Sequence, residues 1–191
     1  MILMRLYDNL NGAKPEVIGV VSAESDITGL DIAAIPAVRA FAMSMKVNIE
    51  ADTAAALQAA AHAAGAKAFL YMEAGTGTMN SNPEQMAPLI ANEVKNGGYD
   101  GLILDIPGLS ESKAAALNKL VKAVNLKLGA MPFYLVTEAP TRSGKAYGGY
   151  SYEKLNGSVD KFILRIPAVE EAAEAFALAP IDPPEEIYYA L

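Results

Sequence analysis

Cysteine and tryptophan are both absent from the 191 residues, and histidine occurs once. Without cysteine the chain has no disulfide, no thiol nucleophile and no thiolate zinc site. With His62 as its one histidine, a histidine-rich metal site or a Ser-His-Asp triad is hard to build. His62 lies in an alanine-rich stretch that ends at Gly65, which is typical of a histidine on a helix surface. We therefore expect no metal and no cofactor.

Positive charge is also scarce. The chain has 15 Lys and Arg against 22 Asp and Glu, for a formal net charge of −7. A general nucleic-acid-binding protein needs basic surface to displace the counterions of phosphates, so nucleic acid is not an expected partner. No apolar stretch approaches the roughly 20 residues that cross a bilayer, so we expect no membrane span. The first residues also lack the charged segment and cleavage site of a signal peptide.

Hydrophobic residues make up 52% of the chain, which suffices for a sizeable core. Short β-rich runs alternate with alanine-rich helical stretches, and this alternation predicts an α/β fold. The runs are mostly apolar on both faces, as in buried parallel strands. They lie at residues 17–23, 38–45, 66–72, 101–106, 132–137, 161–166 and 187–190, and helices are expected at 53–64, 83–95, after a capping segment at 110–112, and at 170–178. No linker divides the chain, so we expect one domain over residues 1–191.

Strand–helix units of this length fit an open doubly wound sheet or a (β/α) barrel. No glycine-rich dinucleotide loop follows the first strand and no Gly-Lys-Ser/Thr phosphate loop occurs, which favours the barrel. A barrel of this type normally closes with about eight strands, one more than the runs above supply. We therefore predict that residues 2–7 form a further strand, antiparallel to the first, in a barrel that is incomplete or atypically closed. The alternatives are a homodimer that covers the edge or a larger parent protein.

One segment resembles a known family. Residues 96–108, Asn-Gly-Gly-Tyr-Asp-Gly-Leu-Ile-Leu-Asp-Ile-Pro-Gly, are similar to the fourth-strand signature of glycoside hydrolase family 18, the chitinase-like barrels, and look closest to their spore-cortex branch. Residues 41–48, 60–70, 150–160 and 183–187 resemble further segments of that family in the same order. The resemblance implies a (β/α)8 TIM barrel whose partner is a glycan containing N-acetylglucosamine, such as peptidoglycan or chitin. It also implies an extracellular or cell-envelope location, although the missing signal peptide leaves the cytoplasm open.

The departures from the family pattern concern catalysis. In that family two aspartates and a glutamate point inward from the fourth strand, and the corresponding residues here are Ile103, Asp105 and Pro107. Proline can neither donate nor accept a proton, so the general acid is missing. The sixth-strand residues that hold the substrate's acetamido group correspond to residues 165–168, Arg-Ile-Pro-Ala, and are lost. The resemblance thus implies a catalytically impaired relative, a pseudoenzyme.

Other polar residues at the expected strand ends could still do chemistry, because barrel sites form at the carboxyl ends of strands. Glu73, Asp105 and Glu138 around Arg165 predict either a new acid/base or metal site, or ion pairs that compensate buried charge, and we favour the ion pairs. Further functions remain open: an active hydrolase with Glu138 or Glu73 as acid, or a structural or assembly domain without a ligand. The residues expected to contact ligand are Arg165, Tyr147 and Tyr150, and two further strand-end residues are Glu24 and Lys46.

Overall fold

The computed structural model describes residues 2–4, 17–21, 38–44, 51–138, 149–165 and 187–190. Its strands form one eight-stranded sheet in which the order in space follows the order in the sequence. Each run of residues that the sequence predicts to be a strand coincides with one of them. The strands are β1 Ile2–Met4, β2 Val17–Val21, β3 Val38–Ser44, β4 Lys67–Glu73, β5 Gly101–Asp105, β6 Phe133–Glu138, β7 Lys161–Arg165 and β8 Ile187–Ala190.

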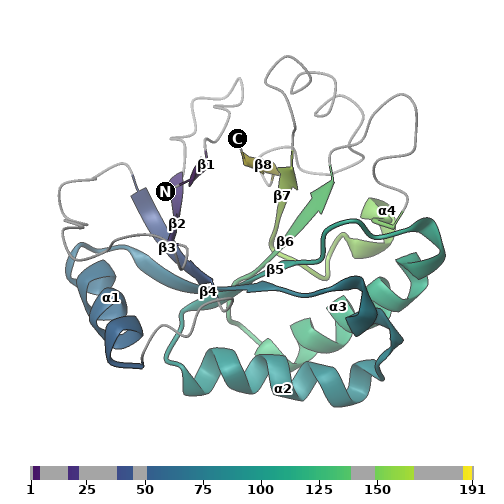
Figure 1. The fold of residues 1–191 in the computed structure, drawn as a ribbon, viewed down its shortest axis with the longest axis horizontal. Helices are drawn as coiled ribbons and strands as arrows, with labels where there is room; N and C mark the ends of the chain where they lie inside the picture. Colours follow the sequence, from purple (N-terminus) through teal and green to yellow (C-terminus); the bar gives the residue numbers. More distant parts are fainter. Residues whose placement is uncertain are drawn as a thin grey trace.

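The sheet is rolled into a barrel that does not close (Figure 1). Strands β2 to β8 are all parallel, whereas β1 runs antiparallel to β2, with Ile2 opposite Val20 and Met4 opposite Ile18. This confirms an antiparallel strand at the N-terminus over residues 2–4 of the predicted 2–7, and residues 5–7 lie outside the described residues. Cα atoms of β1 and β8 approach within 8 Å, yet between the described residues no strand pairing joins these two ends of the sheet. Of the two forms expected from the sequence, the described strands therefore show the incomplete barrel.

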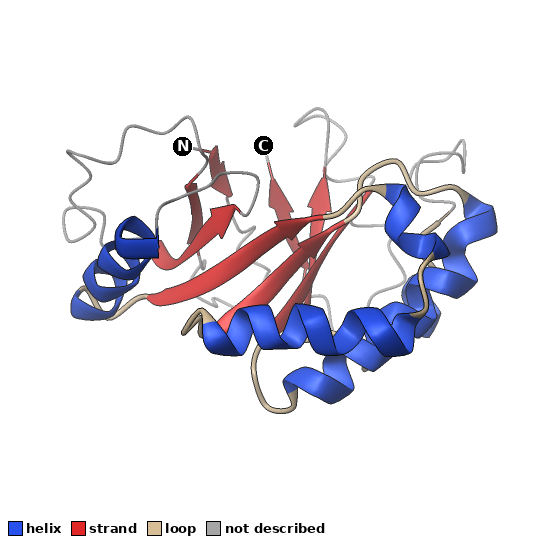
Figure 2. Cartoon of the chain, turned by 60° about the horizontal axis from the view of Figure 1, so that its bottom comes forward, coloured by secondary structure: helices blue, strands red, loops and turns tan. Residues whose placement is uncertain are grey.

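Helices cover the convex side of the rolled sheet (Figure 2). Helix α2 has the start expected from its sequence, because the side chain of Asn82 accepts a hydrogen bond from the Glu84 amide and proline follows as the first helical residue. The helix expected at 170–178 lies outside the described residues. The helices are α1 Ala51–Ala63, α2 Pro83–Asn96, α3 Ala114–Leu128 and α4 Tyr152–Leu155, with short 3-10 helices at Thr76–Asn80 (η2) and Glu111–Lys113 (η3).

The expected cap of α3 is wrong. Ser110 makes no side-chain bond to the helix, and its hydroxyl instead lies 2.9 Å from that of Ser112. The 3-10 helix η3 stands between Ser110 and α3, so the cap position of the α-helix falls on Lys113. In the parts of the chain that the structure describes, no helix combines the length and apolarity that crossing a membrane requires.

Alternate residues of strands β4 to β7 face two separate hydrophobic cores. Leu70, Leu102 and Leu135 point outward and pack with the helices. Their neighbours along the strands point into the barrel, where they form a smaller cluster of Ile18, Phe69, Ile103, Tyr134, Val136 and Ile163. This period of two determines which polar residues near the carboxyl ends of the strands face inward.

Two aspartates form hydrogen bonds between the amino ends of neighbouring strands. Asp100 donates its amide to the Ala68 carbonyl at 2.8 Å and accepts the Ala68 amide on its carboxylate at 2.7 Å. Asp160 makes the same pair of bonds with Phe133, at the same two distances. Burial raises the pKa of Asp100. The hydrogen bond from the Ala68 amide and the contact with His62 at 2.8 Å together lower it by more, so the pKa lies below its ordinary value. His62 lies on the helix surface, as expected.

Gly101 begins β5 at a point where no side chain fits. A Cβ atom there would lie 2.5 Å from the Phe69 ring and 2.6 Å from the Pro132 carbonyl oxygen. We expect Gly101→Ala to lower the free energy of unfolding by about 1–3 kcal/mol, because the backbone must move. Urea denaturation measures this. Gly77→Ala is the matched control, since a Cβ at Gly77 meets nothing within 4 Å. Equal stability of the two variants would contradict the prediction.

Candidate functional site

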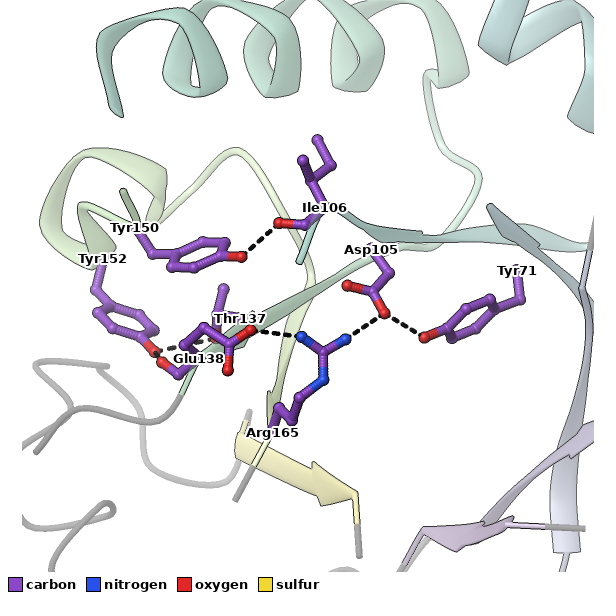
Figure 3. Close-up of polar contacts among 8 residues, drawn as sticks. All are labelled: Tyr71, Asp105, Ile106, Thr137, Glu138, Tyr150, Tyr152 and Arg165. Atoms are coloured by element: carbon purple, nitrogen blue, oxygen red, sulfur yellow. Dashed lines mark hydrogen bonds and ion pairs between the residues drawn. The ribbon is translucent and has the colours of Figure 1, made fainter. Parts of the chain in front are cut away.

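Polar side chains gather inside the barrel at the carboxyl ends of β4 to β7. The period of two that buries Ile103 and Tyr134 also turns Asp105 and Glu138 inward. The strand register then places Glu73 opposite Asp105, and Glu138 opposite Arg165. The structure brings Asp105, Glu138 and Arg165 together, as the grouping of carboxylates around Arg165 in the sequence analysis predicts (Figure 3).

Arg165 lies between two carboxylates. Its Nη1 donates to Glu138 Oε1 and its Nη2 donates to Asp105 Oδ2, both at 2.5 Å. Burial alone would lower the pKa of Arg165, but the charges of Asp105 and Glu138 outweigh it and raise the pKa above its ordinary value. The guanidinium thus stays charged and links the ends of β5, β6 and β7.

Asp105 is the buried centre of this cluster, with 1% of its surface exposed. Its Oδ2 accepts both the Arg165 guanidinium and the Tyr71 hydroxyl, the latter at 2.5 Å. No donor from the described residues reaches the second oxygen, Oδ1, which is itself buried. The carboxylate is therefore held by a cation on one side and a phenol on the other.

Tyr71 offers a pH-dependent test of this arrangement. Burial and the nearby Asp105 carboxylate raise its pKa far above the ordinary value of 10.0. The pKa of Tyr71 is higher in the folded chain than in the unfolded chain. The neutral Tyr71 hydroxyl therefore contributes its full share of the free energy of unfolding below about pH 10, and this share is lost as the pH rises further. We expect the free energy of unfolding to fall with pH above that point, and to fall less steeply in Tyr71→Phe. Urea denaturation between about pH 9 and pH 11 measures both slopes, and identical slopes would refute the assignment.

Two tyrosines fix the segment that follows the undescribed residues 139–148. The Tyr150 hydroxyl donates to the Ile106 carbonyl at 2.6 Å, just beyond β5. The Tyr152 hydroxyl donates to the Glu138 carbonyl at 2.7 Å, at the end of β6. The same hydroxyl lies 3.0 Å from the hydroxyl of Thr137. Both tyrosines are buried. Burial is the main cause that raises the pKa of Tyr150, and the charges of Glu138 and Asp105 raise it as well. In this structure Tyr150 therefore holds the chain in place, and its contact with a ligand stays a prediction.

The remaining candidates divide into two groups. Glu73 is adjacent to Asp105 across the β4–β5 pairing, and its charge contributes to the raised pKa of Tyr71. Pro107 is half-buried in the turn after β5. Tyr147, Glu24 and Lys46 lie outside the described residues.

The site includes residues that the sequence analysis did not identify. Tyr71 precedes Glu73 by two residues, and counting along β4 would have placed it inward. The anchoring roles of Tyr150 and Tyr152 had no comparable signal, because their partners belong to other elements. Within the described ranges, no three His, Asp or Glu side chains come together as metal ligands would.

Chemically, the cluster is a set of acceptors around one cation. Asp105 and Glu138 both serve as hydrogen-bond acceptors toward Arg165. A general acid has to present a proton instead, and its pKa must lie near the operating pH. The structure shows the ion pairs that the sequence favours, those of Arg165 with Asp105 and with Glu138, and a catalytic role for the same residues stays a prediction.

Solved structures of glycoside hydrolases share this fold, whereas no protein-family model and no curated protein sequence matches the chain. A family 18 chitinase from Pseudoalteromonas aurantia superposes with a TM-score of 0.69 at 15% identity, over 88% of this chain and 78% of the chitinase. The spore cortex-lytic enzyme SleL of Bacillus megaterium gives 0.73 at 11% identity, over 90% of this chain and 49% of the enzyme.

The SleL enzyme of Bacillus cereus gives a TM-score of 0.62 at 13% identity, over 80% of this chain and 42% of the enzyme. The chain therefore has the barrel fold of glycoside hydrolase family 18, as its sequence resemblance implied. It spans less than half the length of either SleL enzyme.

Proposed function

We propose that residues 1–191 form a family 18-like domain that binds glycans containing N-acetylglucosamine, such as peptidoglycan or chitin, without hydrolysing them. The shared fold supports the glycan as partner, since the neighbours include chitinases and spore cortex-lytic enzymes. The same neighbours support a place outside the cell or in the cell envelope.

One observation supports the proposal that the domain does not hydrolyse its ligand. Both inward carboxylates at the ends of β5 and β6, Asp105 and Glu138, are hydrogen-bonded to Arg165. Family 18 chemistry needs a carboxylic acid that protonates the leaving oxygen, and the position that resembles it holds Pro107. In the structure both carboxylates serve as hydrogen-bond acceptors toward the Arg165 guanidinium. The network thus supports a binding site whose acid function is absent.

An active hydrolase with Glu138 as acid is the main alternative. Glu138 retains some exposed surface, 23% of its side chain, so a substrate could approach it. Its Oε1 accepts a hydrogen bond from Arg165 Nη1 at 2.5 Å, so the structure shows this oxygen as an acceptor. No feature of the described residues favours this alternative over binding.

Isothermal titration calorimetry with N-acetylchitohexaose tests the proposal. We expect saturable binding by the full chain, together with a sugar of unchanged length after the titration. Arg165→Lys should weaken the binding by about tenfold, because lysine presents a point charge in place of the planar guanidinium fork. Absence of any binding, or shortened sugar in the recovered sample, would contradict the proposal.

A further inference from the structure

We infer that the site recognises the hydroxyl groups of a sugar through Arg165 and Glu138, and that it does not read the N-acetyl group. The inference rests on the proposed function and names its ligand class. That class is linear β-linked hexose chains, whether or not they carry N-acetyl groups. The inference depends on which polar groups of the cluster are exposed to a ligand.

Asp105 is closed to a ligand. Its side chain is 2% exposed, and its Oδ2 already accepts bonds from Tyr71 and Arg165. The other oxygen, Oδ1, has less than 1 Å² of exposed surface. An acetamido N–H would therefore have to displace packed side chains before it met either oxygen. The buried aspartate shapes the site and leaves the N-acetyl group without an acceptor at this position.

Arg165 and Glu138 keep exposed surface in the same cluster, 35% and 23% of their side chains. Their mutual bond uses Nη1 and Oε1, and the bond to Asp105 uses Nη2. A guanidinium has further N–H donors, and Glu138 has a second oxygen besides the Oε1 that Arg165 bonds. The pair thus offers donors beside an acceptor (Figure 3).

Neighbouring sugar hydroxyls match such a pair, because each hydroxyl both donates and accepts a hydrogen bond. The pair is also held in position before any ligand arrives. Asp105 fixes one end of the guanidinium, and the Tyr152 hydroxyl fixes the Glu138 backbone at 2.7 Å. Side chains fixed in this way lose little conformational freedom on binding, which favours affinity.

Calorimetric titration with two matched hexasaccharides tests the inference. N-acetylchitohexaose and cellohexaose have equal length and the same linkage, and they differ in the group at the second carbon of each ring. A hydrogen bond from the acetamido group to a charged acceptor would favour the first sugar by about tenfold or more. We expect both sugars to bind, with dissociation constants less than about tenfold apart.

Three variants separate the roles of the residues. Glu138→Ala should weaken both sugars to a similar extent, by about tenfold, because it removes the exposed acceptor. Asp105→Asn should leave the ratio of the two affinities unchanged, since no ligand reaches this carboxylate. Glu153→Ala, at an exposed glutamate of α4, should change neither affinity.

The outcomes distinguish this inference from the proposed function. A preference for N-acetylchitohexaose of about tenfold or more overturns the inference and leaves the proposed function standing. An Asp105→Asn variant that loses affinity for the N-acetylated sugar alone overturns it as well. Absence of binding to both sugars overturns the proposed function, and this inference with it.

Discussion

Replacing Arg165 by methionine should lower the free energy of unfolding by about 3–5 kcal/mol, because the change leaves a buried charge without its partner. Asp105 is 1% exposed, and Tyr71 would be its one remaining partner among the described residues. Glu138 is more exposed and should contribute less to the loss. Urea denaturation followed by far-UV circular dichroism measures the change.

A double-mutant cycle shows whether the buried charge causes this loss. Asp105→Asn removes the charge but keeps the shape, so Arg165→Met should cost less in that background by at least about 1 kcal/mol. Arg165→Lys should fall between wild type and Arg165→Met, because one ammonium cannot bridge both carboxylates as the guanidinium does. Strictly additive losses, or an Arg165→Met variant as stable as wild type, would show that the ion pairs contribute nothing.

Introducing a glutamate at Pro107 should not create a hydrolase. General acid catalysis contributes about 10²–10⁴-fold, and it works only together with a partner that stabilises the transition state. In this structure the carboxylate nearest in sequence, Asp105, is occupied by Tyr71 and Arg165. The residues that would hold the acetamido group are also replaced in the sequence at 165–168. We expect turnover of a chromogenic chitobioside by Pro107→Glu to stay at the level of buffer.

Pro107→Ala is the control for this prediction, because it removes the proline ring without adding a carboxyl group. Both variants should behave as wild type does. Slow hydrolysis by Pro107→Glu, absent from Pro107→Ala, would show that one acid suffices and that the remaining site is intact.

The sequence predicts the sheet well because each strand is determined by its own residues. The apolar runs at β5 and β6 define the strands, and the resemblance to family 18 then predicts which of their side chains turn inward. Asp105 and Glu138 could therefore be placed in the barrel before the structure was known. The strand at the N-terminus was predictable from closure, since an open edge needs a covering element.

Contacts between distant elements were not predictable in the same way. The Tyr71 and Asp105 side chains are 34 residues apart in sequence, and the Tyr150 hydroxyl is 44 residues from the Ile106 carbonyl that it contacts. Whether they touch depends on how tightly the sheet is rolled, which no local pattern encodes. The Ser110 cap failed for a related reason, because an intervening 3-10 helix moved the start of α3 beyond its reach.

The central claim is binding without hydrolysis, and one mixture tests it directly. The 191-residue chain is incubated with an excess of N-acetylchitohexaose. Saturation-transfer NMR reports whether the sugar binds, and mass spectrometry of the same sample reports its length. We expect saturation transfer to the sugar and an intact hexasaccharide after prolonged incubation. Shorter products that disappear in Asp105→Asn, or a sugar that receives no saturation transfer, would contradict it.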